Sequence, residues 1–93
     1  MAVAFDIVYH HAVVQEDIPR IGAPWRAKIK SAIEEKLSTH PDVYGKPLRR
    51  SLKGYRKLRV GDYRIVFRID KVLIKIFAIA HRSVVYEMSE RRA

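Results

Sequence analysis

The apolar pattern of residues 58–80 constrains the fold more than any other feature of this chain. Apolar and polar residues alternate on both sides of Gly61-Asp62, a pair that suits a two-residue hairpin turn with glycine at its first central position. Such a turn pairs Val60 with Tyr63, and the pairing of the two strands follows from it. A slip of one residue would bury arginines, so we expect this register to be held firmly.

The predicted register separates a core face from a basic face, because successive side chains of a strand point to opposite sides. The core face holds Leu58, Val60, Tyr63, Ile65, Phe67 and Ile69, and the opposite face holds Tyr55, Lys57, Arg59, Arg64, Val66 and Arg68. A second turn at Asp70-Lys71 would pair Ile69 with Val72. It would add Val72, Ile74, Ile76, Ala78 and Ala80 to the core face and place Leu73, Lys75, Phe77, Ile79 and His81 on the basic face.

The rest of the chain predicts one α+β domain over residues 1–93. Residues 3–9 alternate as a strand with Val3, Phe5, Ile7 and Tyr9 on one face, and residues 11–18 suit a short helix. Residues 25–37 carry an apolar residue every fourth position, typical of an amphipathic helix, and residues 41–53 read as a loop. We expect a small antiparallel sheet of this N-terminal strand and a three-stranded C-terminal meander, two helices on one face, and a short C-terminal helix or tail.

Positive charge is concentrated in the hairpin region. The chain has 19 Lys+Arg against 10 Asp+Glu, and residues 46–68 hold nine basic residues against the single acid Asp62. This balance favours nucleic acid as a partner, then an acidic protein, then an anionic membrane. A solvated surface is the alternative, but Arg59 lies opposite Arg64 in the predicted register, and such a pair is unfavourable without an anion between the two.

Composition also argues against several other classes of protein. The chain has no cysteine, no signal-peptide pattern at its start, and no apolar run near the ~20 residues that cross a bilayer. His10-His11 has no nearby cysteine or acidic pair, so a metal site is not expected. We expect a cytoplasmic protein without metal or cofactor.

Two C-terminal motifs carry a resemblance to a known family. Residues 55–67, YRKLRVGDYRIVF, resemble the signature strand pair of RelE-type toxins in the RelE/ParE superfamily, and residues 76–86, IFAIAHRSVVY, resemble their last strand and tail. Leu48 and the Leu52-Lys53-Gly54 segment are similar to the approach to that signature. The resemblance covers essentially the whole chain.

The resemblance implies a type II toxin that cleaves messenger RNA, typically in the ribosomal A site, without a metal, and that an acidic antitoxin holds inactive. A base would take the ribose 2′-hydroxyl proton, the oxygen would attack the adjacent phosphate, and an acid would protonate the leaving 5′-oxygen. By position, the implied catalytic residues are Lys57, Arg59, Arg64, Arg82 and Tyr86.

His81 is a further catalytic candidate because imidazole titrates near neutral pH, and it suits either a general acid or a general base. Tyr86 suits stacking on a base or packing on the sheet. Ribosomal-RNA or messenger-RNA contacts are expected from Lys46, Arg49, Arg50, Lys53 and Arg68. Two other functions stay open: a ParE-like toxin that poisons gyrase without catalysis, and a non-catalytic RNA-binding module.

Overall fold

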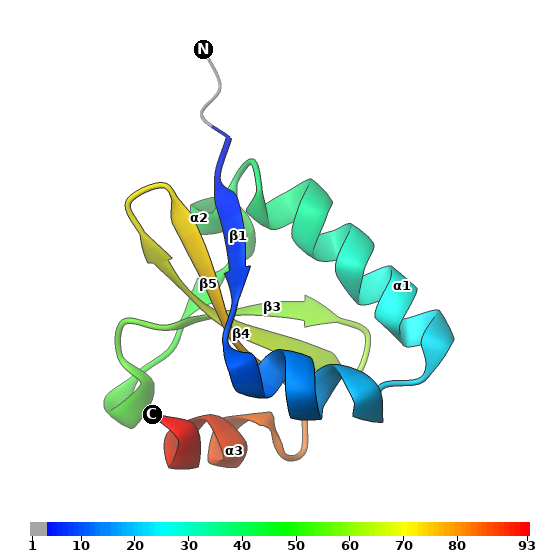
Figure 1. The fold of residues 1–93 in the computed structure, drawn as a ribbon. Coiled ribbons are helices and arrows are strands. Elements are labelled where there is room, and N and C mark those ends of the chain that lie inside the picture. Colours follow the sequence, from blue (N-terminus) through cyan, green and yellow to red (C-terminus); the bar gives the residue numbers. More distant parts are fainter. Residues whose placement is uncertain (1–3) are drawn as a thin grey trace.

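The centre of the molecule is a mixed sheet, seen in the computed structural model, which describes residues 4–93 (Figure 1). Within those residues the sheet has five strands in the order β1-β5-β4-β3-β2. The strands are β1 (Asp6–Tyr9), β2 (Lys46–Pro47), β3 (Arg56–Val60), β4 (Tyr63–Asp70) and β5 (Leu73–His81). The helical segments are η1 (Val13–Asp17), η2 (Ile18–Arg20), α1 (Ala23–Ala32), η3 (Ile33–Leu37), α2 (Pro41–Tyr44), η4 (Arg50–Leu52) and α3 (Val85–Arg92).

The hairpin of β3 and β4 has the predicted register. Val60 pairs with Tyr63 and Arg59 with Arg64. Gly61 adopts φ +59, a left-handed conformation that glycine tolerates better than any other residue. A side chain at this position would also collide with the ring of Trp25, which α1 places against the turn. The turn is therefore specified both by its own backbone and by the helix that packs on it.

The pairing of β4 with β5 differs from the prediction. The turn is Lys71-Val72 rather than Asp70-Lys71, so that Ile69 pairs with Ile74. A β-bulge then interrupts the ladder, because Phe67 pairs with Ile76 whereas Val66 pairs with Ala78. The bulge leaves one extra residue, Phe77, on β5.

This extra residue reverses the side-chain alternation of the end of β5. Ile79 pairs with Ile65 and is buried in the main core, whereas Ala78 is buried with Val66 on the other face. The prediction was wrong for the four residues that follow Phe77. Ala78 and Ala80 lie on the basic face, and Ile79 and His81 lie on the core side of the sheet.

The α+β architecture is confirmed, with two differences of detail. β1 runs parallel to β5, with Ile7 beside Ile74, so the sheet is not wholly antiparallel. The segment expected as a loop contains α2, η4 and the short strand β2, which adds Lys46 and Pro47 to the edge of β3. Phe5 and Ile7 pack on the core as predicted, and Val3 lies outside the described residues.

Two apolar layers lie on opposite faces of the sheet. The larger layer packs η1 and the continuous helix of α1 and η3 on one face, through Val13, Ile29, Ile33, Leu37, Ile65, Phe67, Ile74, Ile76 and Ile79. The smaller layer packs α3 on the other face, through Val85, Val66 and Ala78 with Leu48, Tyr55, Phe77, Tyr86 and Met88 around them. The predicted pair of helices on one face is thus confirmed, and the C-terminal segment forms a helix.

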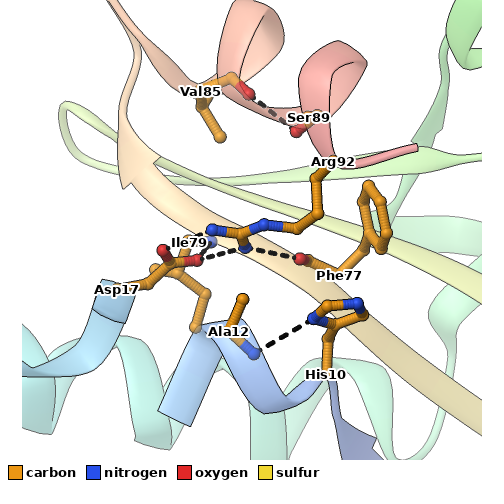
Figure 2. Close-up of polar contacts among 8 residues, drawn as sticks. All are labelled: His10, Ala12, Asp17, Phe77, Ile79, Val85, Ser89 and Arg92. Carbon is orange, nitrogen blue, oxygen red and sulfur yellow. Dashed lines mark hydrogen bonds and ion pairs between the residues drawn. The ribbon is translucent and has the colours of Figure 1, made fainter. Parts of the chain in front are cut away.

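A buried ion pair joins η1 to α3 at the bulge (Figure 2). The Asp17 carboxylate accepts hydrogen bonds from the Ile79 backbone N–H at 3.0 Å and from the Arg92 guanidinium at 2.8 and 3.0 Å. Arg92 also donates to the Phe77 carbonyl at 2.9 Å. The two side chains are 1% and 12% exposed. The pair therefore provides hydrogen-bond partners for the Phe77 carbonyl and the Ile79 N–H, which lie past the end of the pairing between β1 and β5 at Ile76. It also holds α3 on the sheet.

Candidate nucleic-acid interface

The β3–β4 hairpin presents four cations on the face opposite the main helices. Lys57 and Arg59 come from β3, and Arg64 and Arg68 come from β4. The Arg64 guanidinium folds back on the turn and donates to the carbonyls of Gly61 at 2.8 Å and Tyr63 at 3.0 Å. These two bonds fix the guanidinium at the tip of the hairpin, across the ladder from Arg59.

The positive charge of this face is not neutralised by carboxylates of the described residues. Within residues 4–93, none of the four hairpin cations forms an ion pair. Asp62, the acid in the turn itself, has its Oδ1 atom 3.7 Å from Arg82 Nε, in an exposed pair that contributes at most ~1 kcal/mol. Arg82 also donates its backbone N–H to the Asp62 carbonyl at 2.8 Å. The surface is therefore suited to bind an anion between Arg59 and Arg64.

Tyr86 lies beside this surface. Its ring centroid is 5.7 Å from Lys57 Nζ, a cation–π distance, and α3 positions the ring from above the sheet. Both side chains are half-buried. The structure thus places Lys57, Arg59 and Arg64 on one face, as the register predicted, with Tyr86 packed on the sheet beside Lys57.

His81 lies elsewhere. The bulge in β5 sets it opposite Tyr63, with ring centroids 6.1 Å apart, so it is not on the face of Arg64. Its Nδ1 accepts the Ser83 backbone N–H at 3.2 Å and lies 2.8 Å from Ser83 Oγ. The ring nitrogen that accepts a backbone N–H carries no proton, which places the proton of the neutral ring on Nε2.

Sequence comparison places the chain in a family. Residues 8–86 match the model described as ParE toxin of type II toxin-antitoxin system, parDE. The chain belongs to this toxin family. It is also 35% identical over 92 residues to Toxin RelE of Mycobacterium tuberculosis (strain ATCC 25618 / H37Rv), an alignment covering 94% of this chain and 95% of that protein.

Solved structures agree. The crystal structure of the toxin-antitoxin complex RelBE2 from Mycobacterium tuberculosis contains a chain that matches this toxin with a TM-score of 0.80 and 29% identity, over 87% of this chain and 94% of that one. The RelB-RelE antitoxin-toxin complex from Methanococcus jannaschii matches with a TM-score of 0.68 and 25% identity, over 86% and 95%. The protein is thus a type II toxin of the RelE/ParE superfamily.

The outer basic residues of the toxin fall into two groups. Lys46 pairs with Lys57 across β2 and β3, and the Arg68 guanidinium lies 5.9 Å from the Tyr55 ring centroid, so both belong to the sheet. The others, Arg49, Arg50 and Lys53, are exposed on and beside η4. Their role as RNA contacts stays a prediction.

Sequence reasoning missed Asp17 and Arg92 as a structural pair. A signal for Asp17 was present, because it stands four residues after Val13 and four before Ile21, both buried. An acid on such an apolar stripe calls for a buried partner. The partner could not be found from spacing, since it is 75 residues away.

Over residues 4–93, no three His, Cys, Asp or Glu side chains are grouped as a metal ion would require. No helix in that part of the chain has the length and apolarity needed to cross a membrane.

Proposed function

We propose that this toxin is a metal-independent endoribonuclease that cleaves messenger RNA in the ribosomal A site, in the cytoplasm. One observation carries the proposal: Lys57, Arg59 and Arg64 share one sheet face with no carboxylate partner among residues 4–93. Two arginines directly opposite each other repel in the free protein, and a phosphate between them converts that repulsion into attraction. The adjacent Tyr86 offers a nucleobase a ring to stack on.

The reaction follows from these groups. A base removes the proton of a ribose 2′-hydroxyl, the oxygen attacks the neighbouring phosphorus, and the bond to the 5′-oxygen breaks as that oxygen gains a proton. Arg64, held by two carbonyls, stabilises the charge that develops on the phosphate. Lys57 and Tyr86, 5.7 Å apart on this face, are the candidate proton carriers, and Arg59 and Arg82 orient phosphates. His81 lies opposite Tyr63 on the core side of the sheet, so Lys57 and Tyr86 take the proton-transfer roles.

The proposed partners follow from the same surface. Two solved relatives are complexes with an antitoxin, and we propose that an acidic antitoxin segment covers the cations of the hairpin here. Ribosomal and messenger RNA would contact Lys46, Arg49, Arg50, Lys53 and Arg68. The reaction needs no membrane, metal or cofactor.

The description of the matched family model favours a second candidate function. The match to a ParE toxin family is the observation behind it. By the resemblance, a ParE-like toxin would inhibit gyrase by binding and would catalyse nothing. A non-catalytic RNA-binding module is the third reading of the same face.

Cell-free translation with primer extension separates these functions. We expect wild type to cut messenger RNA at fixed codon positions, and Arg64→Ala to cut about 100-fold more slowly or worse. Arg91→Ala is the matched control, because Arg91 pairs with Glu87 on the exposed side of α3. Inhibited supercoiling without cuts would support the gyrase function, and binding without cuts would support the RNA-binding module.

A further inference from the structure

A second concave surface lies at the edge of the sheet where β5 ends, between residues of the main core and residues of the α3 layer. It is a cleft of about 200 Å³ between η2, the end of β5 and the start of α3. Figure 1 shows the blue helical segment that follows β1 near α3 at this end of the molecule. Its apolar wall includes Ile21, Ile79 and Val84, and its polar and aromatic wall includes Arg20, Tyr63 and His81.

The bulge in β5 is what brings His81 into this cleft. Without the extra residue, His81 would lie on the face of Arg64, and the cleft would have no imidazole. As built, the imidazole meets the Tyr63 ring edge to face at 6.1 Å. Ser83 occupies Nδ1, so Nε2 is the ring nitrogen left to bind another molecule.

The charge of the cleft is positive. Asp17 lies at its base, but its carboxylate is fully engaged by Arg92 and by the Ile79 N–H (Figure 2). Arg20 is exposed and forms no ion pair with any residue from 4 to 93. The cleft thus offers a cation, two aromatic rings and an apolar wall.

We propose that this cleft binds one unpaired nucleobase of the RNA, with the Tyr63 ring stacking on it, the His81 ring, at 78° to that of Tyr63, contacting its edge, and Arg20 binding its edge or flanking phosphate. The inference rests on the proposed function, because the bound base is the neighbour of the phosphate held by Arg64. Tyr63 and Arg64 are consecutive, and the Arg64 guanidinium donates to the Tyr63 carbonyl. The volume is below the ~300–1,000 Å³ of pockets for drug-sized ligands, which suits a single planar ring system.

An abasic scan of the messenger RNA tests the proposal. Programmed ribosomes carry messages in which one nucleotide at a time, on either side of the cleaved bond, lacks its base but keeps its ribose. For wild type we expect kcat/KM to fall roughly 5- to 150-fold at one position, the range set by loss of one stacked base. Tyr63→Leu should lose that penalty, whereas Tyr44→Leu, which removes an exposed tyrosine from α2, should keep it.

A second measurement uses only wild-type protein, because Tyr63 is half-buried and its variant could fail to fold. The message carries 4-thiouridine at the sensitive position and a 2′-deoxy sugar at the cleaved nucleotide, which blocks attack. Cross-links to residues 18–21, 63 or 79–84 support the proposal, and cross-links elsewhere overturn it. A message that wild type never cuts would refute the proposed function; the 4-thiouridine is then placed at each A-site position in turn, and the cross-link still decides the cleft. Normal cutting with no abasic penalty at any position overturns the base-binding proposal and favours a protein side chain as occupant.

Discussion

Replacing Arg92 by methionine tests how the toxin holds α3. Methionine retains an unbranched apolar chain like the aliphatic part of arginine, but it removes all three hydrogen bonds of the guanidinium. Asp17 is then left with the Ile79 N–H alone, at a site where its side chain is 1% exposed. Breaking one partner of a buried ion pair costs about 3–5 kcal/mol, because the other charge stays buried and unpaired.

This cost is large for a domain of this size. A chain of 93 residues has a free energy of unfolding of about 5–14 kcal/mol, at ~0.05–0.15 kcal/mol per residue. Arg91→Met is the matched control one residue away. Arg91 pairs with Glu87 at 3.2 Å, but the two side chains are 75% and 74% exposed, so its loss should cost less than ~0.5 kcal/mol.

Urea unfolding followed by far-UV circular dichroism measures both variants. We expect a clearly lower midpoint for Arg92→Met and a midpoint near wild type for Arg91→Met, with unchanged slopes. The double variant Asp17→Asn/Arg92→Met should cost less than the two single changes added together, because it leaves no unpaired buried charge. Equal midpoints for Arg91→Met and Arg92→Met would refute the assignment of the buried pair, as would strict additivity in the cycle.

Three further changes test the hairpins and the start of η1. Gly61→Val should cost at least ~2 kcal/mol in urea unfolding, because it combines φ +59 with a collision against Trp25; a cost under ~0.5 kcal/mol would contradict the turn geometry. Lys71→Gly should raise stability by about 1 kcal/mol in the same assay, since Lys71 has φ +57, and a loss would mean that the turn is otherwise constrained. Burial, with the nearby charges of His11 and Arg92, lowers the pKa of His10, whose Nδ1 accepts the Ala12 N–H. The unfolded chain then takes up the proton first, so stability should fall as pH drops through ~6.5 and level off below the folded pKa. His10→Gln should remove this part of the pH dependence, and an unchanged profile would contradict it.

The hairpin and the helices could be predicted because their patterns are unambiguous. Gly61 determines the turn, and alternation on either side of it puts arginines on one face and large apolar residues on the other. Nothing comparable constrains residues 76–80, Ile-Phe-Ala-Ile-Ala, where every residue is apolar. Either phase of alternation would bury apolar side chains there, so the pattern carries no information about the bulge.

The candidate site was predictable to the same extent. Lys57, Arg59 and Arg64 lie within the unambiguous hairpin, and their shared face followed from it. His81 lies beyond the bulge, so its face was predicted wrongly. Tyr86 was placed by resemblance, and its contact with Lys57 depends on how α3 docks, to which the distant Asp17–Arg92 pair and the smaller apolar layer both contribute.

The bulge in β5 matters for comparing toxins of this family. Adding or removing one residue in that strand reverses the alternation of its last side chains. Those that faced the hairpin cations then face the cleft, and the reverse, while the first half of the strand keeps its pairing. A histidine aligned by letter with His81 in a relative without the bulge would therefore lie on the other side of the sheet. The insertion or deletion of a single codon in this strand would therefore change which side chains surround the substrate. Catalytic roles should be transferred between relatives by strand pairing, because identical residues in a sequence alignment can lie on opposite faces of the sheet.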